Sequence, residues 1–385
     1  MSTQQERRVR VALAGLRFGA AFIPIYLDHP NVKHLGIVDP DVATLMIQGD
    51  RYGIDRKHTG LAEVIKSDEY DAVHLVTPIP LHTEQTIAVL NSGKHCACAV
   101  PMATSLEDLD AIVTAQRESG KNYMMMETAV YSREFLYAQE LVTSGRLGRI
   151  QFLRGAHYQD MAGWAGYWEG LPPMLYGTHA ISPGLAIAES RAVEVHCFGS
   201  GVMDEALHRQ YGNPFPVESA IFQLEAPNLA MEVTRSHFQT ARGYAESFCV
   251  YGEKMTFEWP QVQTDSSSVV FTKGKPGFPL TNRGILPTVT ERISPPDRKD
   301  MLPLEIARFT VESMYDETDL EKDFKVGGGH HGSHPHLVHE FIRSIVEERK
   351  PWIDEVKSAD WTAAGICAHD SAMQGGKAVR VPSFL

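Results

Sequence analysis

The stretch that decides the fold is Val9-Arg-Val-Ala-Leu-Ala-Gly15-Leu-Arg-Phe-Gly19-Ala20, near the N-terminus. Its apolar run ends in a glycine-containing turn, and a helical stretch follows through Tyr26 and Leu27. In a parallel sheet, such a turn lets a pyrophosphate approach the backbone, and the N-terminus of the next helix faces the negative charge. The same pattern also fits an ordinary strand–turn–helix, so the turn alone leaves both interpretations open.

Compared with the dinucleotide fingerprint G-x-G-x-x-G/A, the turn reads Gly15, Arg17 and Ala20. Arginine therefore replaces the middle glycine, and Gly19 offers a second place for close approach. An arginine beside a pyrophosphate is electrostatically favourable. We expect Gly15, Arg17 and the adjacent Phe18 to contact a cofactor.

Asp39 strengthens this interpretation because it ends the next apolar run. At this spacing the fold brings an acidic residue to the adenosine ribose. A carboxylate accepts hydrogen bonds from both ribose hydroxyls and repels a 2′-phosphate, which favours NAD over NADP. The alternative is a solvated aspartate that starts a turn before Pro40.

Working outward from this stretch, strand-like and helix-like segments alternate through the first third of the chain. Strands are expected at 9–14, 34–38, 72–76, 95–100 and 122–126, with helices between them. Alternation of this kind predicts an α/β fold with a parallel sheet covered on both faces. Ligands bind beyond the carboxyl ends of such strands. Thr77 and Pro78 follow a strand end and are expected beneath the dinucleotide, and His82, which completes a Thr-Pro-x-x-x-His pattern, is expected to border the cofactor. Glu127 ends the last strand and is expected to hold the nicotinamide ribose or a sugar hydroxyl, although a salt bridge at a domain junction would also explain it.

The whole chain has 385 residues and carries 36 Lys+Arg against 48 Asp+Glu, a net charge of −12. Hydrophobic residues make up 43% and charged residues 22%, values that exclude a disordered or fibrous protein. The acidic balance argues against a nucleic-acid partner, because such binding relies on basic faces. The 17 histidines are the unusual feature, since imidazole titrates near neutral pH.

The sequence also bears on the cellular compartment. The N-terminal apolar run is too short for a signal-peptide core, and no window approaches the roughly 18 apolar residues of a membrane helix. The five cysteines show no CxxC spacing, which argues against a disulfide framework or a zinc site. We therefore expect a cytoplasmic protein without a membrane partner.

Several motifs, taken in chain order, resemble the Gfo/Idh/MocA family of NAD(P)-dependent sugar oxidoreductases. They are Ala14-Gly-Leu-Arg-Phe-Gly19, Thr77-Pro-Ile-Pro-Leu-His82, Ser92-Gly-Lys-His95, Gly145-Arg-Leu-Gly148, Gly327-Gly-Gly-His-His-Gly-Ser-His334 and Gly375-Gly-Lys-Ala-Val-Arg-Val-Pro382. The resemblance implies an NAD-binding Rossmann domain over residues 1–128. It also implies an α+β domain over 129–385 with a large, mostly antiparallel open sheet that binds substrate, and C-terminal helices that pack back on the first domain. A homo-oligomer, either a dimer or a tetramer, is implied as well.

The chain departs from the dehydrogenases of this family at the residues that carry their proton transfer. Those members have Glu-Lys-Pro where this chain has Ala99-Val100-Pro101, and many have an aspartate where this chain has Leu175. His179, four residues after Leu175, is retained. The resemblance places Val100 and Pro101 beside the cofactor and leaves His179 without its usual lysine and aspartate.

These replacements resemble one branch of the family, the NAD-dependent glycosidases of the α-N-acetylgalactosaminidase type. The similar segments are Tyr123-Met-Met-Met-Glu127 and Leu175-Tyr-Gly-Thr-His179. That branch oxidises a sugar at carbon 3, eliminates the aglycone across carbons 1 and 2, adds water and returns the hydride, which needs no pair of carboxylates. The resemblance implies this reaction here. The alternatives are an NAD-dependent sugar or glycoside 3-dehydrogenase that releases a 3-keto product, and a non-catalytic NAD-bound sugar sensor.

His179 is the predicted base, because the pKa of imidazole suits proton abstraction near neutral pH. Tyr176 lies three residues earlier, so a helical segment would place both side chains on one face. His157, Tyr158 and Tyr131 are further candidates for proton transfer. A buried histidine satisfied by the backbone and aromatic rings that pack beneath a sheet are the alternatives.

Sugar sites combine flat apolar rings with fixed polar groups. The side chains expected there are Trp164, Arg133, Arg154, His331 and His334, although interface packing, helix capping or solvated loop positions would also explain them. Arginines, among them Arg235, would suit an anionic glycoside such as a sulfoquinovoside, because the guanidinium fork matches oxyanions.

The densest histidine cluster runs from His330 to His339. It fails the HExxH zinc pattern, because Arg343 stands where the second histidine is required. Pro335 predicts the first turn of a helix, with Ser333 or His334 as its cap. We therefore predict a histidine-bearing loop before a helix, and no metal site.

Overall fold

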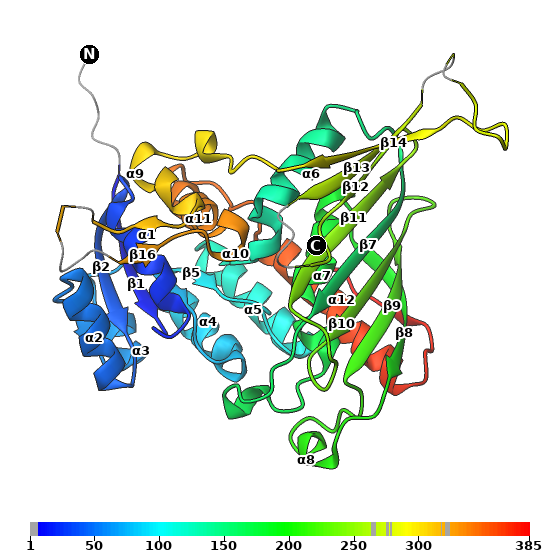
Figure 1. The fold of residues 1–385 in the computed structure, drawn as a ribbon. Coiled ribbons are helices and arrows are strands. Elements are labelled where there is room, and N and C mark those ends of the chain that lie inside the picture. The colour runs from blue at the N-terminus through cyan, green and yellow to red at the C-terminus, as the bar shows by residue number, and fades with distance from the viewer. Residues whose placement is uncertain (1–6, 263–266, 275–276, 278, 317, 320–323) are drawn as a thin grey trace. The chain divides into compact units, whose positions relative to one another are not determined.

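The computed structural model (Figure 1) describes residues 7–262, 267–274, 277, 279–316, 318–319 and 324–385. The chain divides into two compact units. The first unit comprises residues 1–132, 297–359 and 384–385, and the second comprises 133–296 and 360–383. Residues 297–359 thus group with the N-terminal part of the chain.

The first unit is built on a six-stranded parallel sheet in the order β3-β2-β1-β4-β5-β6. The strands are β1 (Val9–Ala14), β2 (Val32–Val38), β3 (Lys57–His58), β4 (Ala72–Leu75), β5 (His95–Cys98) and β6 (Tyr123–Met125). Five of them lie where apolar runs predict them, because strands buried on both faces are apolar throughout. The edge strand β3 has only two residues, neither of them apolar, so no apolar run predicted it. The predicted Rossmann topology is confirmed.

Helices connect these strands, as right-handed crossovers require. They are η1 (Gly19–Phe22), α1 (Ile23–Asp28), α2 (Val42–Tyr52), α3 (Leu61–Lys66), η2 (Ile79–Leu81), α4 (His82–Asn91) and α5 (Leu106–Ser119), and η3 (Thr128–Tyr131) follows β6. Side-chain caps fix two of the starts: Asp41 accepts a hydrogen bond from Ala43 N before α2, and Ser105 from Asp108 N before α5. Helix α4 packs against both α3 and α5.

The later part of the first unit returns to this sheet. It contains η6 (Lys299–Met301), α9 (Leu304–Ala307), η7 (Arg308–Thr310), the hairpin β15 (Ser313–Met314) and β16 (Lys325–Val326), α10 (Gly329–Gly332) and α11 (His334–Val346). Helix α11 has Pro335 in its first turn and packs against α1 and β1. His330 and His331, predicted on a loop, thus lie in α10, which packs against η3 and η7, and His334 begins α11.

The second unit is built on a nine-stranded sheet in the order β14-β13-β12-β11-β7-β10-β9-β8-β17, drawn in green, yellow and red in Figure 1. The strands are β7 (Ile150–Tyr158), β8 (Ala192–Ser200), β9 (Val217–Leu224), β10 (Ala230–Ser236), β11 (Ala245–Gly252), β12 (Met255–Glu258), β13 (Ser268–Lys273), β14 (Thr288–Ile293) and β17 (Val379–Arg380). Strands β7 and β10 run parallel and the other neighbouring pairs are antiparallel. The prediction of a large, mostly antiparallel sheet is confirmed.

Helices cover one face of this sheet, which we call the helix face. They are α6 (Arg133–Thr143), α7 (Thr178–Ile187) and the part of α12 (Glu355–Met373) from residue 360 onward, and the short elements η4 (Gly166–Trp168), η5 (Pro173–Tyr176) and α8 (Glu205–His208) lie in the connections. Phe135 of α6 packs on Phe248 of β11 with ring centroids 6.0 Å apart, and a Cβ at Gly155 of β7 would collide with the carbonyl oxygen of Ala180 in α7. On the other face Ile221 and Phe198 are 47% and 59% exposed.

Among the described residues, no helix combines the length and the hydrophobicity that a bilayer crossing requires.

Candidate active site

The turn after β1 is shaped by Gly15. Its φ is +90°, a backbone conformation that side chains rarely adopt, and a Cβ here would collide with the carbonyl oxygen of Val76 after β4. Glycine is therefore required where these two strand ends approach each other. The result is a backbone cradle at the carboxyl edge of the sheet, which fits the pyrophosphate of a dinucleotide.

Asp39 holds this cradle together. Its Oδ2 accepts a hydrogen bond from Leu16 N at 2.8 Å and its Oδ1 accepts one from Asp41 N at 2.9 Å. The residue is 8% exposed. An ionised carboxylate has about four acceptor positions, so these two bonds leave capacity for a ribose hydroxyl. Arg17 and Phe18, also predicted at the cofactor, are exposed on the same turn.

His82 lies beneath the next strand ends. Nδ1 lies 2.8 Å from the carbonyl oxygen of Pro101 and Nε2 lies 2.9 Å from that of Thr77, and the ring is buried. Because both partners only accept, both nitrogens donate in the doubly protonated ring. Burial opposes that charge, but the neighbouring Cys98 sulfur and the two carbonyls outweigh it and raise the pKa of His82 to about 9.

His82 therefore acts as a clamp: it joins, through one hydrogen bond to each, the segments after β4 and β5 that were predicted to contact the cofactor. Thr77 and Pro78 follow β4, and Val100 and Pro101, joined by a cis peptide bond, follow β5. Val100 is buried and carries no proton to exchange, so a proton-transfer group must come from elsewhere.

Glu127 and Tyr131 follow β6. Glu127 is completely buried, and its Oε1 accepts a hydrogen bond from Ala129 N at 3.0 Å, which caps η3. Tyr131 stacks on His336 of α11, with ring centroids 6.4 Å apart, and meets the edge of Trp352. Burial raises the pKa of Tyr131, so this hydroxyl stays protonated.

The segment that contains His330 and His334 packs against the glycine turn after β1. The rings of His330 and His334 lie 5.5 Å and 5.7 Å from the ring of Phe18. His330 and His331 have φ values of +43° and +55°, which is uncommon for residues other than glycine. Within this unit the structure therefore brings His334, predicted at the substrate, to the cofactor turn.

A second cluster of predicted residues lies in the second unit. Tyr176 ends η5 and His179 is in the first turn of α7, and the hydroxyl oxygen of Tyr176 lies 3.3 Å from Nε2 of His179. The ring of Trp168 meets the ring of Tyr176 edge-on at 4.9 Å. Tyr176 and His179 therefore lie side by side as expected, although Tyr176 belongs to a 3₁₀ turn and His179 to the helix that follows it.

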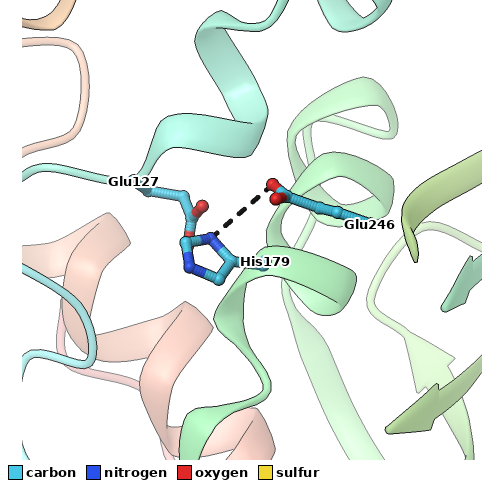
Figure 2. Close-up of side chains that lie close together, drawn as sticks. All are labelled: Glu127, His179 and Glu246. Carbon is cyan, nitrogen blue, oxygen red and sulfur yellow. Dashed lines mark ion pairs between the residues drawn. The ribbon is translucent and has the colours of Figure 1, made fainter. Parts of the chain in front are cut away.

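Glu246 of β11 approaches the other nitrogen of the same ring. Its Oε1 lies 3.8 Å from Nδ1 of His179, an ion-pair contact marked by the dashed line in Figure 2, and both side chains are buried. The hydroxyl of Tyr244 donates to Oε2 of Glu246 at 2.6 Å. The ring of His157 lies 5.3 Å from that of His179 and 5.2 Å from that of Tyr244. Three predicted residues, His157, Tyr176 and His179, thus meet two that were not predicted, Tyr244 and Glu246.

Arg235 of β10 is completely buried beside this cluster. Its guanidinium donates to the carbonyl oxygens of Tyr176 (3.1 Å), His157 (3.1 Å) and Ser236 (3.0 Å), and to Oε1 of Gln159 (3.0 Å). Burial lowers the pKa of Arg235 to about 10 and drives the pKa of His157 well below its usual value, so His157 is neutral near pH 7. Arg235 therefore holds the backbone of the cluster in place.

Two family models match the chain. The oxidoreductase family with an NAD-binding Rossmann fold matches residues 9–127, and the Gfo/Idh/MocA C-terminal domain matches residues 135–258. The chain belongs to the Gfo/Idh/MocA oxidoreductase family. The first unit is thus an NAD-binding Rossmann domain, which confirms the predicted cofactor.

Curated relatives in this family differ in their named activities. A 4-carboxy-2-hydroxymuconate-6-semialdehyde dehydrogenase from a Sphingobium species is 30% identical over 140 residues, 36% of this chain and 44% of that protein. A glycosyl hydrolase family 109 protein from Streptomyces niveus is 22% identical over 409 aligned positions, 98% of this chain and 78% of that protein. The chain spans less than half the length of the first curated relatives it matches.

Solved structures share this fold over nearly the whole chain. A levoglucosan dehydrogenase in complex with NADH and levoglucosan superposes with a TM-score of 0.75, covering 98% of this chain and 100% of that one at 17% identity. At this identity the likeness establishes the fold alone.

Not every predicted residue joins the cluster around His179. Arg154 faces the opposite side of the sheet from His157, where its Nε lies 3.2 Å from Oε1 of Glu232. Tyr158 also points away from His157 and lies under the guanidinium of Arg242 at 5.3 Å. Arg133 begins α6. We therefore leave Arg154 and Tyr158 out of the proposed site, and substrate contact by Arg133 stays a prediction.

Trp164 remains a candidate for sugar contact. It is 49% exposed and meets Trp168 edge-on at 5.5 Å, and Trp168 in turn contacts Tyr176. The rings of Trp164, Trp168 and Tyr176 therefore form a contiguous aromatic row within the second unit, with Trp164 at its exposed end.

Proposed function

We propose that this Gfo/Idh/MocA protein is an NAD-dependent glycosidase that cleaves a sugar glycoside by transient oxidation at carbon 3. The observation that carries the proposal is the pairing of half-buried Tyr176 with buried His179, whose hydroxyl oxygen and Nε2 lie 3.3 Å apart. The similarity of nearly the whole chain to a glycosyl hydrolase family 109 protein supports it. The family assignment supports NAD as the cofactor.

NAD, when bound, supplies a reversible hydride acceptor. The protein holds it through the Gly15 cradle, which Asp39 ties to the second strand, and the clamp of His82 keeps the neighbouring strand ends in place. These groups bind and orient, and none of them needs to transfer a proton.

His179 takes the proton of the carbon-3 hydroxyl in this proposal, because Val100 has none to exchange. Loss of that proton and of the hydride leaves a ketone at carbon 3, which acidifies the hydrogen at carbon 2. Transfer of the carbon-2 proton to a base would then break the bond between carbon 1 and the aglycone, whose oxygen would take up a proton. Water would add its hydroxyl to carbon 1 and a proton to carbon 2, and return of the hydride to carbon 3 would restore the alcohol. Tyr176 is placed to hand protons to and from Nε2 of His179.

A sugar or glycoside 3-dehydrogenase is the second candidate. Its support is the relative that shares 30% identity, which is named a dehydrogenase, and the levoglucosan dehydrogenase structure with the same fold. The two candidates share the first oxidation and differ in whether the hydride returns to the sugar. A non-catalytic NAD-bound sugar sensor would do neither.

We propose an uncharged sugar as the substrate. The prediction of an anionic glycoside such as a sulfoquinovoside relied on arginines near the site. Arg235 is fully engaged with backbone carbonyls and Gln159, and Arg154 pairs with Glu232 on the opposite face. The exposed Trp164 offers instead a flat apolar surface, which suits a sugar ring. A cytoplasmic location and a homo-oligomer remain predictions.

The test is to measure release of nitrophenol and formation of NADH with a panel of 4-nitrophenyl glycosides and no added NAD. The glycosidase releases many equivalents of nitrophenol per protein while absorbance at 340 nm shows no net NADH. A dehydrogenase requires added NAD and produces one NADH per 3-keto product, and this result would replace the first candidate by the second. Sugar binding without either product would leave the sensor.

A further inference from the structure

His179 has a buried acidic neighbour that its own segment does not supply. Leu175, four residues earlier, cannot provide a carboxylate, but Oε1 of Glu246 lies 3.8 Å from Nδ1 of His179. The two side chains are 4% and 2% exposed. A carboxylate buried this deeply is costly unless it is paired, so its place beside an imidazole requires an explanation.

The sheet register fixes where Glu246 lies. It is paired with His157 of β7, His157 with Arg235 of β10, and Arg235 with Glu218 of β9. These four side chains form a row across four neighbouring strands on the helix face, beneath α7. The position of Glu246 relative to α7 is therefore set by backbone hydrogen bonds of the sheet rather than by a loop.

Tyr244 fixes the orientation of the carboxylate. Its hydroxyl donates to Oε2 of Glu246 at 2.6 Å, a short charge-assisted hydrogen bond. Burial and the neighbouring carboxylate raise the pKa of Tyr244, so the hydroxyl keeps its proton and remains a donor. With Oε2 occupied in this way, Oε1 is the oxygen that faces His179.

Contacts on both ring nitrogens of His179 favour one tautomer. The negative charge of Oε1, 3.8 Å from Nδ1, favours a proton on that nitrogen. Nε2 then carries the lone pair and accepts from the hydroxyl of Tyr176. We propose that Glu246, held by Tyr244, is a positioning residue that makes Nε2 of His179 the base and stabilises the imidazolium that forms.

This inference rests on the proposed function, in which a sugar hydroxyl is oxidised. The O–H bond breaks, its proton passes to Nε2 through the Tyr176 hydroxyl, and the hydride leaves carbon 3 for NAD. The proton on Nδ1 stays between His179 and Glu246 throughout. When the hydride returns, the proton returns from Nε2 to the sugar oxygen, so the charge pair exists only while the ketone exists.

The charged groups around His179 differ in whether they favour its protonation. Within the second unit, the titratable groups around His179 include His157, Arg235, Tyr176, Tyr244 and Glu246. Buried Arg235 disfavours a further positive charge, and His157 is neutral. The carboxylate of Glu246 therefore favours protonation of His179.

The test uses the NAD-loaded full chain labelled with ¹⁵N-histidine. In the wild type, NMR should show His179 as the Nδ1–H tautomer. In Glu246→Gln the tautomer preference should be lost, and the pKa of His179 should fall by about one or more, because an opposite charge within roughly 4–6 Å has been removed. Single-turnover hydride transfer, measured at 340 nm with a 4-nitrophenyl glycoside, should fall about 10²- to 10⁴-fold, with NAD affinity unchanged.

Matched variants separate positioning from folding. Glu246→Asp keeps the carboxylate and should restore the tautomer and part of the rate, and Tyr244→Phe should lower the rate about 5- to 10-fold by freeing the carboxylate to turn. Glu232→Gln removes the same charge from the opposite face of the sheet and should leave the His179 spectrum unchanged. If Glu246→Gln does not fold, Glu246→Asp and Tyr244→Phe decide.

An unchanged tautomer and an unchanged His179 titration in Glu246→Gln overturn the proposal, even if the variant is less active. Failure of the proposed function gives a different result from failure of the positioning role. If the His179 signals change as expected but no glycoside is oxidised, Glu246 still positions His179, and the assigned reaction is wrong.

Discussion

Replacement of Arg235 by lysine tests whether the buried guanidinium organises the cluster around His179. Arg235 donates four hydrogen bonds at 3.0–3.1 Å, three of them to backbone carbonyl oxygens. A lysine ammonium keeps the positive charge but has three donors at one point and no fork. It cannot reach carbonyls that belong to η5, β7 and β10 at the same time.

The expected cost follows from these contacts. A hydrogen bond to a charged group is worth about 1.5–3 kcal/mol, and an unsatisfied buried carbonyl costs a further fraction of that. Loss of one or two of the four bonds therefore predicts a destabilisation of about 2–4 kcal/mol for Arg235→Lys. The Tyr176 carbonyl is among the acceptors, so hydride transfer should also slow.

Urea unfolding followed by tryptophan fluorescence measures this change. Four of the five tryptophans, Trp164, Trp168, Trp259 and Trp361, belong to the second unit, so the signal reports mainly on that unit. Arg154→Lys is the control, because Arg154 forms a half-exposed ion pair on the opposite face and should change stability by less than about 0.5 kcal/mol. Equal stability of the two variants would refute the role assigned to Arg235.

Three further predictions concern the first unit. Gly15→Ala should weaken NAD binding at least about tenfold in a fluorescence titration, because its Cβ meets the Val76 carbonyl and its φ is positive; wild-type affinity would show that the cradle is not the cofactor site. Asp39→Ser should weaken NAD binding and narrow the preference for NAD over NADP in the same titration, since both the turn and the negative charge are lost. The pKa of His82 is raised to about 9, although burial opposes it, so its stabilising contribution is complete below about pH 6.5 and is lost as the pH rises through 9. His82→Gln should therefore be less stable than wild type at pH 6.5 and closer to it at pH 9.5 in urea titrations, and a pH-independent gap would contradict the doubly protonated ring.

The first sheet was largely predictable because its information is local. Buried parallel strands are short apolar runs, and Gly15 marks the turn that connects β1 to the next helix. The second sheet was not predictable from local pattern. Strand β7 pairs with β10 and β11, which lie far along the chain, and such pairings leave no trace in either strand alone. Its architecture was available only through the resemblance of motifs to a family.

The same reason explains which site residues were found. Tyr176 and His179 are close in sequence, so their contact followed from spacing. Glu246 was missed because strand register, not sequence distance, brings it to His179. A usable signal was present: Glu246 stands two residues before Phe248 in an apolar strand, and an acid among buried positions is expensive.

Arg154 was assigned to the site for a related reason. It lies on β7 only three residues before His157, but successive side chains point to opposite faces, so an odd separation puts it on the far side of the sheet. Asp39 shows a different limit. The sequence suggested a ribose contact, and the structure adds a role in holding the turn that no spacing rule indicated.

The proposal that His179 serves reversible oxidation is tested most directly by cleavage of a glycoside in D₂O. For wild type, the released sugar should carry deuterium at carbon 2 and none at carbon 3, because the carbon-2 proton exchanges with solvent while the hydride returns from the cofactor. His179→Ala should retain NAD and release no aglycone. Aglycone release without deuterium at carbon 2, or undiminished release by His179→Ala, would contradict the proposal.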